Sequence, residues 1–154
     1  MVKDDSDPYG MDFGPARRIK TAGAGVFRTL DRNASGCRFR MLNDIHGNAA
    51  RFKALAQGTD SLDLLIMNGD MVSYITDIET ALSSVFGTGP ELVADVPSVW
   101  VRGNHETRGR DAAQMKRYAP TPTGEPYHLL RHGPVAILVL DAGEDKPDGN
   151  AEYS

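Results

Sequence analysis

Three strand-like runs, each followed at once by polar residues, constrain the fold of this 154-residue chain more than any other feature. The runs are Phe39–Leu42, Leu62–Met67 and Val96–Val101, and their apolar, β-branched and aromatic content predicts three strands. Residues 48–57 and 76–86 lie between them and show apolar residues at helical spacing. Parallel strands joined by one helical crossover lie near each other. We therefore expect an α/β fold with one parallel sheet.

Potential ligand residues stand at the end of each predicted strand. Asp44 and His46 follow the first run, Asp70 follows the second, and Asn104 and His105 follow the third. The carboxyl ends of parallel strands form the sheet edge at which ligands bind. Carboxylate, imidazole and amide groups are ligands of divalent cations. Any one of these residues alone is more often a turn former, but their repetition after three strands predicts a metal site.

The same residues resemble the motifs of a known family. The order Asp44-x-His46, Gly69-Asp70 and Gly103-Asn104-His105-Glu106 is similar to that of the calcineurin-like metallophosphoesterases. The resemblance extends from about residue 39 to about residue 145. It implies a four-layer α-β-β-α sandwich, of which this chain would form the N-terminal half.

The resemblance also implies a dinuclear metal centre. Asp44 and His46 would bind one ion, Asp70 would bridge both, and Asn104 would bind the second through its side-chain oxygen. The two ions would be divalent or trivalent, with manganese, iron and zinc as the candidates. A bridging carboxylate would screen their mutual repulsion, and a hydroxide held by the ions would attack phosphorus.

The third motif would supply the catalytic residues. By resemblance, His105 would face the phosphate and stabilise or protonate the departing oxygen. Glu106 would bond to that imidazole and keep it cationic, since a neighbouring carboxylate favours the charged form. Arg102, Arg108 and Arg110 surround the motif and could orient a phosphate group, although a solvated loop explains these three arginines equally well.

The function implied is the hydrolysis of phosphate mono- or diesters, with a small phosphate ester or a phosphoprotein as substrate. Two alternatives remain open. The chain could be a catalytically incomplete fragment or module that binds metal, or an ordinary α/β domain in which Asp44 and Asp70 only cap turns. The first alternative arises because the family completes its site with histidines downstream of the third motif.

Only His128 and His132 follow the third motif, and neither lies in the family's pattern. His132-Gly133-Pro134 instead predicts the turn of a hairpin between residues 127–131 and 135–140. Before the hairpin, Asp111–Tyr118 predicts a short helix with Met115 and Tyr118 inward. We therefore expect a truncated domain whose missing C-terminal half is its partner, and whose uncovered sheet face exposes an apolar patch.

Composition limits the remaining possibilities. We expect residues 1–35 to be a leader or the tail of a preceding domain, with Val26–Leu30 as its last strand, and residues 36–154 to be a partial metallophosphoesterase domain. A net charge of −4 and a pI near 5.5 argue against a broad nucleic-acid surface. The sequence contains no signal-peptide core and no membrane-spanning run. The compartment stays open, and a secreted or periplasmic parent protein is compatible with the sequence.

Overall fold

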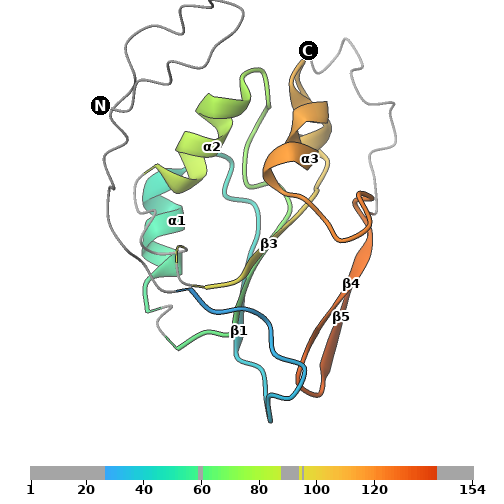
Figure 1. Ribbon diagram of the computed structural model, residues 1–154. Helices are drawn as coiled ribbons and strands as arrows, with labels where there is room; N and C mark the ends of the chain where they lie inside the picture. The colour runs from blue at the N-terminus through green and yellow to red at the C-terminus, as the bar shows by residue number, and fades with distance from the viewer. Residues whose placement is uncertain (1–26, 59–60, 88–93, 95, 142–154) are drawn as a thin grey trace, which may run out of the picture.

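Three parallel strands form the centre of the molecule (Figure 1). The computed structural model describes residues 27–58, 61–87, 94 and 96–141. The strands are β1 (Phe39–Leu42), β2 (Leu64–Asn68) and β3 (Ser98–Val101), and they pair in the order β1-β2-β3. The predicted α/β class and the parallel sheet are therefore confirmed, and all three carboxyl ends lie at one edge.

Two helices connect these strands, as the apolar spacing predicted. Helix α1 (Ala49–Ala56) begins after Asn48, whose side-chain oxygen accepts from the backbone N–H of Arg51. Helix α2 (Ile78–Phe86) begins after Asp77, whose carboxylate accepts from the backbone N–H of Thr80. These caps satisfy N–H groups that the helix itself leaves without a partner.

The core lies between the sheet and these two helices. Leu65 and Met67 of β2 pack with Phe52 of α1, Val85 of α2 and Trp100 of β3. Leu64 and Ile66 are also buried, and they point to the opposite face because side chains alternate along a strand. The central strand is thus buried on both faces, as its apolar sequence predicted.

The segment after β3 contains short helical turns instead of one continuous helix. They are η2 (His105–Thr107), η3 (Ala112–Gln114) and α3 (Met115–Tyr118). Met115 is buried as expected, but Tyr118 is 46% exposed, so its predicted inward position is wrong. Tyr118 stands at the end of a single helical turn, and the chain leaves the helical conformation at Ala119.

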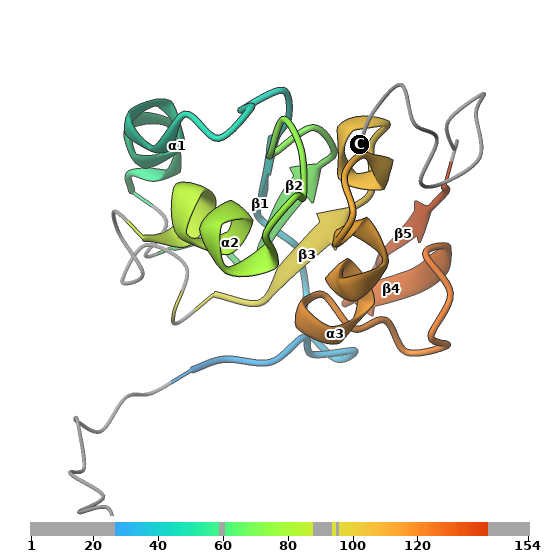
Figure 2. The same ribbon diagram turned by 90° about the horizontal axis from the view of Figure 1, so that it is seen from above.

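A hairpin covers the other side of the sheet. Strands β4 (His128–His132) and β5 (Val135–Val139) pair in antiparallel register and form a separate two-stranded sheet. Gly133 in the turn has a φ of 54°. Figures 1 and 2 place this hairpin across the sheet from α1 and α2. The predicted hairpin is confirmed, and it covers the parallel sheet instead of extending it by pairing.

The outer face of this hairpin is apolar and open to solvent. Leu129 and Leu138 lie opposite each other in the register and are 60% and 65% exposed. Tyr127 and Leu140, which flank the two strands, are more than half exposed as well. The expected apolar patch was on the parallel sheet, whereas this patch lies on the hairpin, and β2 of the parallel sheet is buried on both faces.

The N-terminal segment contacts the hairpin turn. The backbone N–H of Asp31 donates to Nδ1 of His132 at 3.1 Å, and Gly133 N–H donates to the carbonyl of Asp31 at 2.8 Å. No strand forms over residues 27–30, so the predicted strand is wrong in that part, and residues 1–26 lie outside the described residues. In the part of the chain that the structure describes, no helix is long and apolar enough to cross a membrane.

Candidate metal centre

Backbone hydrogen bonds join the loops that follow β1 and β2. Asp44 N–H donates to Gly69 O at 3.2 Å, His46 N–H to Asp70 O at 3.0 Å, and Gly47 N–H to Met71 O at 2.7 Å. These bonds continue the pairing of the two strands beyond their ends. Asp44 and His46 are thereby held next to the Asp70 loop.

Three candidate ligands adopt a backbone conformation that is unusual for residues other than glycine. Asp44, His46 and Asp70 have φ values of 56°, 53° and 55°. The left-handed region costs an L-residue about 1–2 kcal/mol. Residues held in such conformations concentrate at functional sites. Among the described residues these are the non-glycine positions with positive φ, and all three are predicted metal ligands.

Two glycines allow the second and third motifs to touch. A Cβ atom on Gly103 would lie 2.8 Å from the backbone nitrogen of Asp70, and nearer still to the Asp70 carboxylate. A Cβ on Gly69 would lie 3.0 Å from Cα of Gly103. Any larger residue would push the two loops apart, so these glycines bring Asp70 against the loop that carries Asn104 and His105.

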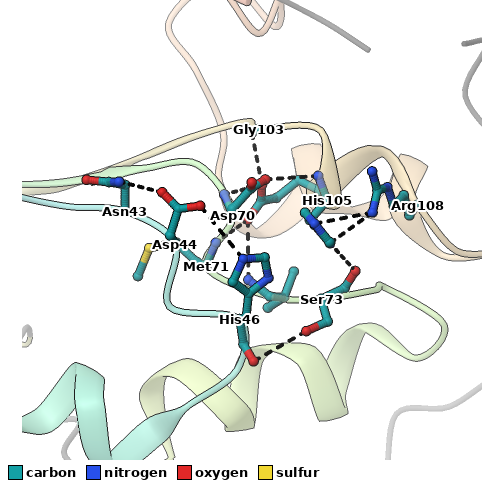
Figure 3. A network of polar contacts seen from close by, with 11 residues as sticks. Asn43, Asp44, His46, Asp70, Met71, Ser73, Gly103, His105 and Arg108 are labelled. Atoms are coloured by element: carbon teal, nitrogen blue, oxygen red, sulfur yellow. Dashed lines mark hydrogen bonds and ion pairs between the residues drawn. The ribbon is translucent and has the colours of Figure 1, made fainter. Parts of the chain in front are cut away.

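The compact part of the site consists of His46, Asp70 and His105 (Figure 3). Each offers one ligand atom, and these atoms all lie within 4.8 Å of one another. The two imidazole rings are perpendicular, with centroids 4.5 Å apart. Two ligands of one ion, each at about 2.0–2.2 Å, lie at most about 4.4 Å apart. Small side-chain movements would therefore let the three residues share an ion.

Asp44 lies beside this group but outside it. Its Oδ1 is 3.7 Å from Nε2 of His46, and its other oxygen accepts from the side chain of Asn43. The side chain is 62% exposed. The predicted sharing of an ion between Asp44 and Asp70 stays a prediction.

The amide of Asn104 lies between the carboxylate of Asp70 and the guanidinium of Arg108. With its nitrogen toward Asp70, it donates to the two carboxylate oxygens at 3.1 and 3.2 Å, and its oxygen accepts from Nη2 of Arg108 at 2.6 Å. With its oxygen toward Asp70, three oxygen atoms face one another, which is favourable only with a cation between them. The donor set of Asp70 and Asn104 therefore fits a hard or borderline cation.

The imidazole of His105 is oriented by its neighbours. Nδ1 lies 2.9 Å from the carbonyl oxygen of Ser73. Because a carbonyl oxygen can only accept, Nδ1 carries the hydrogen and donates a hydrogen bond to this oxygen. Nη1 of Arg108 lies 3.2 Å from Nε2 and 3.3 Å from Nδ1. The backbone N–H of His105 donates to Oδ1 of Asp70 at 3.0 Å. This geometry permits His105 to bind a metal or to transfer a proton at Nε2.

Glu106 does not make the contact that the sequence predicted. It is 0% exposed, and its carboxylate accepts from the backbone N–H groups of Asp70 and Met71 at 2.8 Å, from Gly103 N–H at 2.9 Å and from Trp100 Nε1 at 3.2 Å. Adjacent residues in a 3₁₀ turn point in different directions, so Glu106 turns inward where His105 turns toward the site. The predicted pairing with the imidazole is wrong, and Glu106 instead ties the second motif to the third.

The three arginines near the third motif have different partners in the structure. Arg108 contacts His105 and Asn104, whereas Arg102 pairs with Asp141 and Arg110 donates to the carbonyl of Thr76. The predicted placement of Asp141 at the sheet edge is confirmed by this pair, because Arg102 directly follows β3. No pattern in the sequence distinguished Arg108. Its partners, Asn104 and His105, lie in the same loop and come within reach only when that loop folds back.

Fold and site together define an α/β protein with a cluster that could bind metal at the carboxyl edge of its parallel sheet. The model of the calcineurin-like phosphoesterase family matches residues 37–146, and the chain belongs to this family. The match confirms the resemblance inferred from the three motifs. No curated protein and no solved structure matches the chain.

Proposed function

We propose that this protein hydrolyses phosphate mono- or diesters with the help of bound divalent or trivalent metal ions. The observation that supports this function is that two candidate metal ligands, His46 and Asp70, converge within 4.8 Å with the candidate proton donor His105, in a chain that belongs to a phosphoesterase family. Two of these residues hold strained backbone conformations, a cost that a metal site explains. As part of the same proposal, the chain would form the N-terminal half of a four-layer α-β-β-α sandwich.

The ions would be held by Asp44, His46, Asp70 and Asn104, and we propose Asp70 as the ligand that they would share. Bound ions would supply Lewis-acid chemistry, which activates water and stabilises charge on phosphoryl oxygens. The Asn104 amide is neutral, so it adds no negative charge near an anionic phosphate ester. The substrate would be a small phosphate ester or a phosphoprotein.

His105 is the residue best placed to move a proton. Its Nδ1–H donates to the Ser73 carbonyl, which leaves Nε2 as the atom that takes up or delivers a proton. The departing oxygen of a phosphate ester needs such a proton, and a positioned imidazole typically contributes about 10²–10⁴-fold in rate. Glu106 positions Asp70 and Gly103 through their backbone N–H groups and does not touch the substrate.

The test is an assay of the full chain with p-nitrophenyl phosphate and bis(p-nitrophenyl) phosphate, in the presence of manganese, iron or zinc. We expect metal-dependent turnover, and we expect Asp70→Ala to lose at least about 100-fold, because metal chemistry is worth several kcal/mol. Asp111→Asn is the matched control, since Asp111 makes no side-chain capping bond at the start of η3. Absence of turnover with every metal, or full activity in Asp70→Ala, would contradict the proposal.

A second candidate is a metal-binding module without catalysis. It is favoured by one observation, namely that Asp44 lies outside the compact three-residue cluster, which leaves one ion site better formed than two. Calorimetric titration of the full chain with manganese or zinc distinguishes the candidates. Tight binding of two ions excludes the module, and binding of a single ion without turnover supports it.

A further inference from the structure

Arg108 contacts two of the candidate site residues, His105 and Asn104. Nη1 lies against both ring nitrogens of His105, at 3.2 and 3.3 Å, while Nη2 lies 2.6 Å from the outer atom of the Asn104 amide. The two arms of one guanidinium thus hold two different residues of the site (Figure 3 shows the arm on His105). The planar guanidinium suits this task, because its donors stand in a fixed fork.

The orientation of the Asn104 amide decides what the second arm can do. When the amide nitrogen faces Asp70, the amide oxygen faces Arg108 and accepts from Nη2. When the amide oxygen turns to a cation beside Asp70, the amide nitrogen faces Nη2 at the same short distance. Two N–H donors cannot bond to each other, so Nη2 must then leave Asn104 and find another acceptor.

We propose that Arg108 is an anion-binding and positioning residue, and that metal binding releases its Nη2 group from Asn104. With a cation held by Asp70 and Asn104, the amide oxygen would face the cation, and the freed Nη2 would bind a phosphoryl oxygen while Nη1 would keep its contact with His105. The inference rests on the proposed function for the identity of the anion as a phosphoryl group. It deepens that function, because it makes recognition of the anion conditional on metal.

Electrostatics favours the same exchange. The Asn104 oxygen that accepts from Nη2 is neutral, whereas a phosphoryl oxygen carries negative charge. Hydrogen bonds between charged partners are shorter and roughly twice as strong as neutral ones, and arginine is well suited to phosphate. Arg108 therefore gains a stronger partner in the loaded site than the one that it loses.

The test measures the affinity of the full chain for inorganic phosphate by calorimetry, with and without Zn²⁺, in wild type and in Arg108→Gln. With Zn²⁺, we expect Arg108→Gln to weaken phosphate binding about 10- to 100-fold, as expected for a charge-assisted bond. Without Zn²⁺, the same substitution should change any phosphate binding by less than about threefold. The four measurements form a cycle that isolates the coupling between metal and Arg108.

Arg110→Gln is the matched control, because Arg110 is exposed and donates to the carbonyl of Thr76 outside the site. It should leave phosphate affinity within about twofold of wild type. Arg108→Lys keeps the charge but loses the fork, and we expect it to recover part of the affinity. Equal losses in Arg108→Gln with and without Zn²⁺, or no loss with Zn²⁺, would overturn the proposal.

A second measurement follows the amide itself. In a nitrogen-15 spectrum of the full chain, the side-chain amide signals of Asn104 should shift when Zn²⁺ is added without phosphate. Unchanged signals at saturating Zn²⁺ would overturn the proposed turn of the amide.

Binding and turnover also separate this inference from the proposed function. Metal-coupled phosphate binding without turnover of any ester would support the inference and contradict the hydrolysis. Turnover that is unaffected by Arg108→Gln, in both rate and KM, would support the hydrolysis and contradict the inference.

Discussion

Replacing Glu106 with glutamine should destabilise the whole fold, because one buried carboxylate joins two of the three motif loops. Oε2 accepts from the backbone N–H groups of Asp70 and Gly103, at 2.8 and 2.9 Å. Oε1 accepts from Met71 N–H and from the Trp100 indole, at 2.8 and 3.2 Å. Every one of these partners is a donor, so the site requires two acceptor oxygens.

Glutamine supplies only one acceptor oxygen. If its oxygen takes the place of Oε1, its NH₂ group faces the N–H groups of Asp70 and Gly103. Each buried donor left without a partner costs about 1–3 kcal/mol, so two donors cost about 2–6 kcal/mol. Domains of this size are stable by about 5–15 kcal/mol in total. Glu106→Gln should therefore remove a large fraction of the free energy of unfolding.

Urea denaturation followed by Trp100 fluorescence provides the assay. We expect the midpoint to fall while the slope with urea stays unchanged, which indicates lower stability without a change in the unfolding transition. Glu79→Gln, at an exposed position in the first turn of α2, is the control and should stay within about 0.5 kcal/mol of wild type. A Glu106→Gln protein as stable as this control would refute the reasoning.

Three further predictions test other parts of the structure. His105→Asn should lower kcat about 100-fold or more while metal affinity is retained in calorimetry, and loss of metal binding would instead make His105 a ligand. Hydrogen bonds from the Thr80 side chain and backbone hold the pKa of Asp77 below its usual value of 3.8. The ionised Asp77 therefore stabilises the start of α2 at pH values above 3.8. This stabilisation is lost as the pH falls through the lowered pKa. The melting temperatures of wild type and Asp77→Ala should therefore differ at pH 7 and converge in strong acid; a constant difference would contradict this. Burial, and secondly the charge of Asp63, raise the pKa of the Cys37 thiol, so iodoacetamide should alkylate it at pH 7.5 more slowly than it alkylates free cysteine.

Much of the fold followed from local sequence patterns. The run Phe39–Leu42 was predicted with its observed bounds, and both crossover helices were predicted within two residues of theirs. The hairpin turn at Gly133 was predicted because glycine and proline together mark turns. These features depend on short-range propensities and on apolar periodicity, which are visible in a single sequence.

Other features depended on partners distant in the chain. Tyr118 was expected inside, but it is the last residue of α3, just before Ala119 and Pro120, where the chain leaves the helical conformation. Glu106 was expected beside His105 because the two are neighbours in sequence, yet its partners come from residues 70–72, 100 and 103. The direction of one side chain in a tight turn is set by long-range packing and hydrogen bonding, which a motif does not encode.

The sequence by itself determined the family, the single parallel sheet and the edge at which the ligand residues gather, because three motifs each end a strand and parallel strands end together. Only the tertiary structure decided which of these residues touch. It placed His46, Asp70 and His105 in one cluster and left Asp44 at its margin. It also turned Glu106 into the core and brought Arg108 to the imidazole. The physical reason is that buried donors require acceptors wherever the chain can supply them, and only the folded chain brings those acceptors within reach.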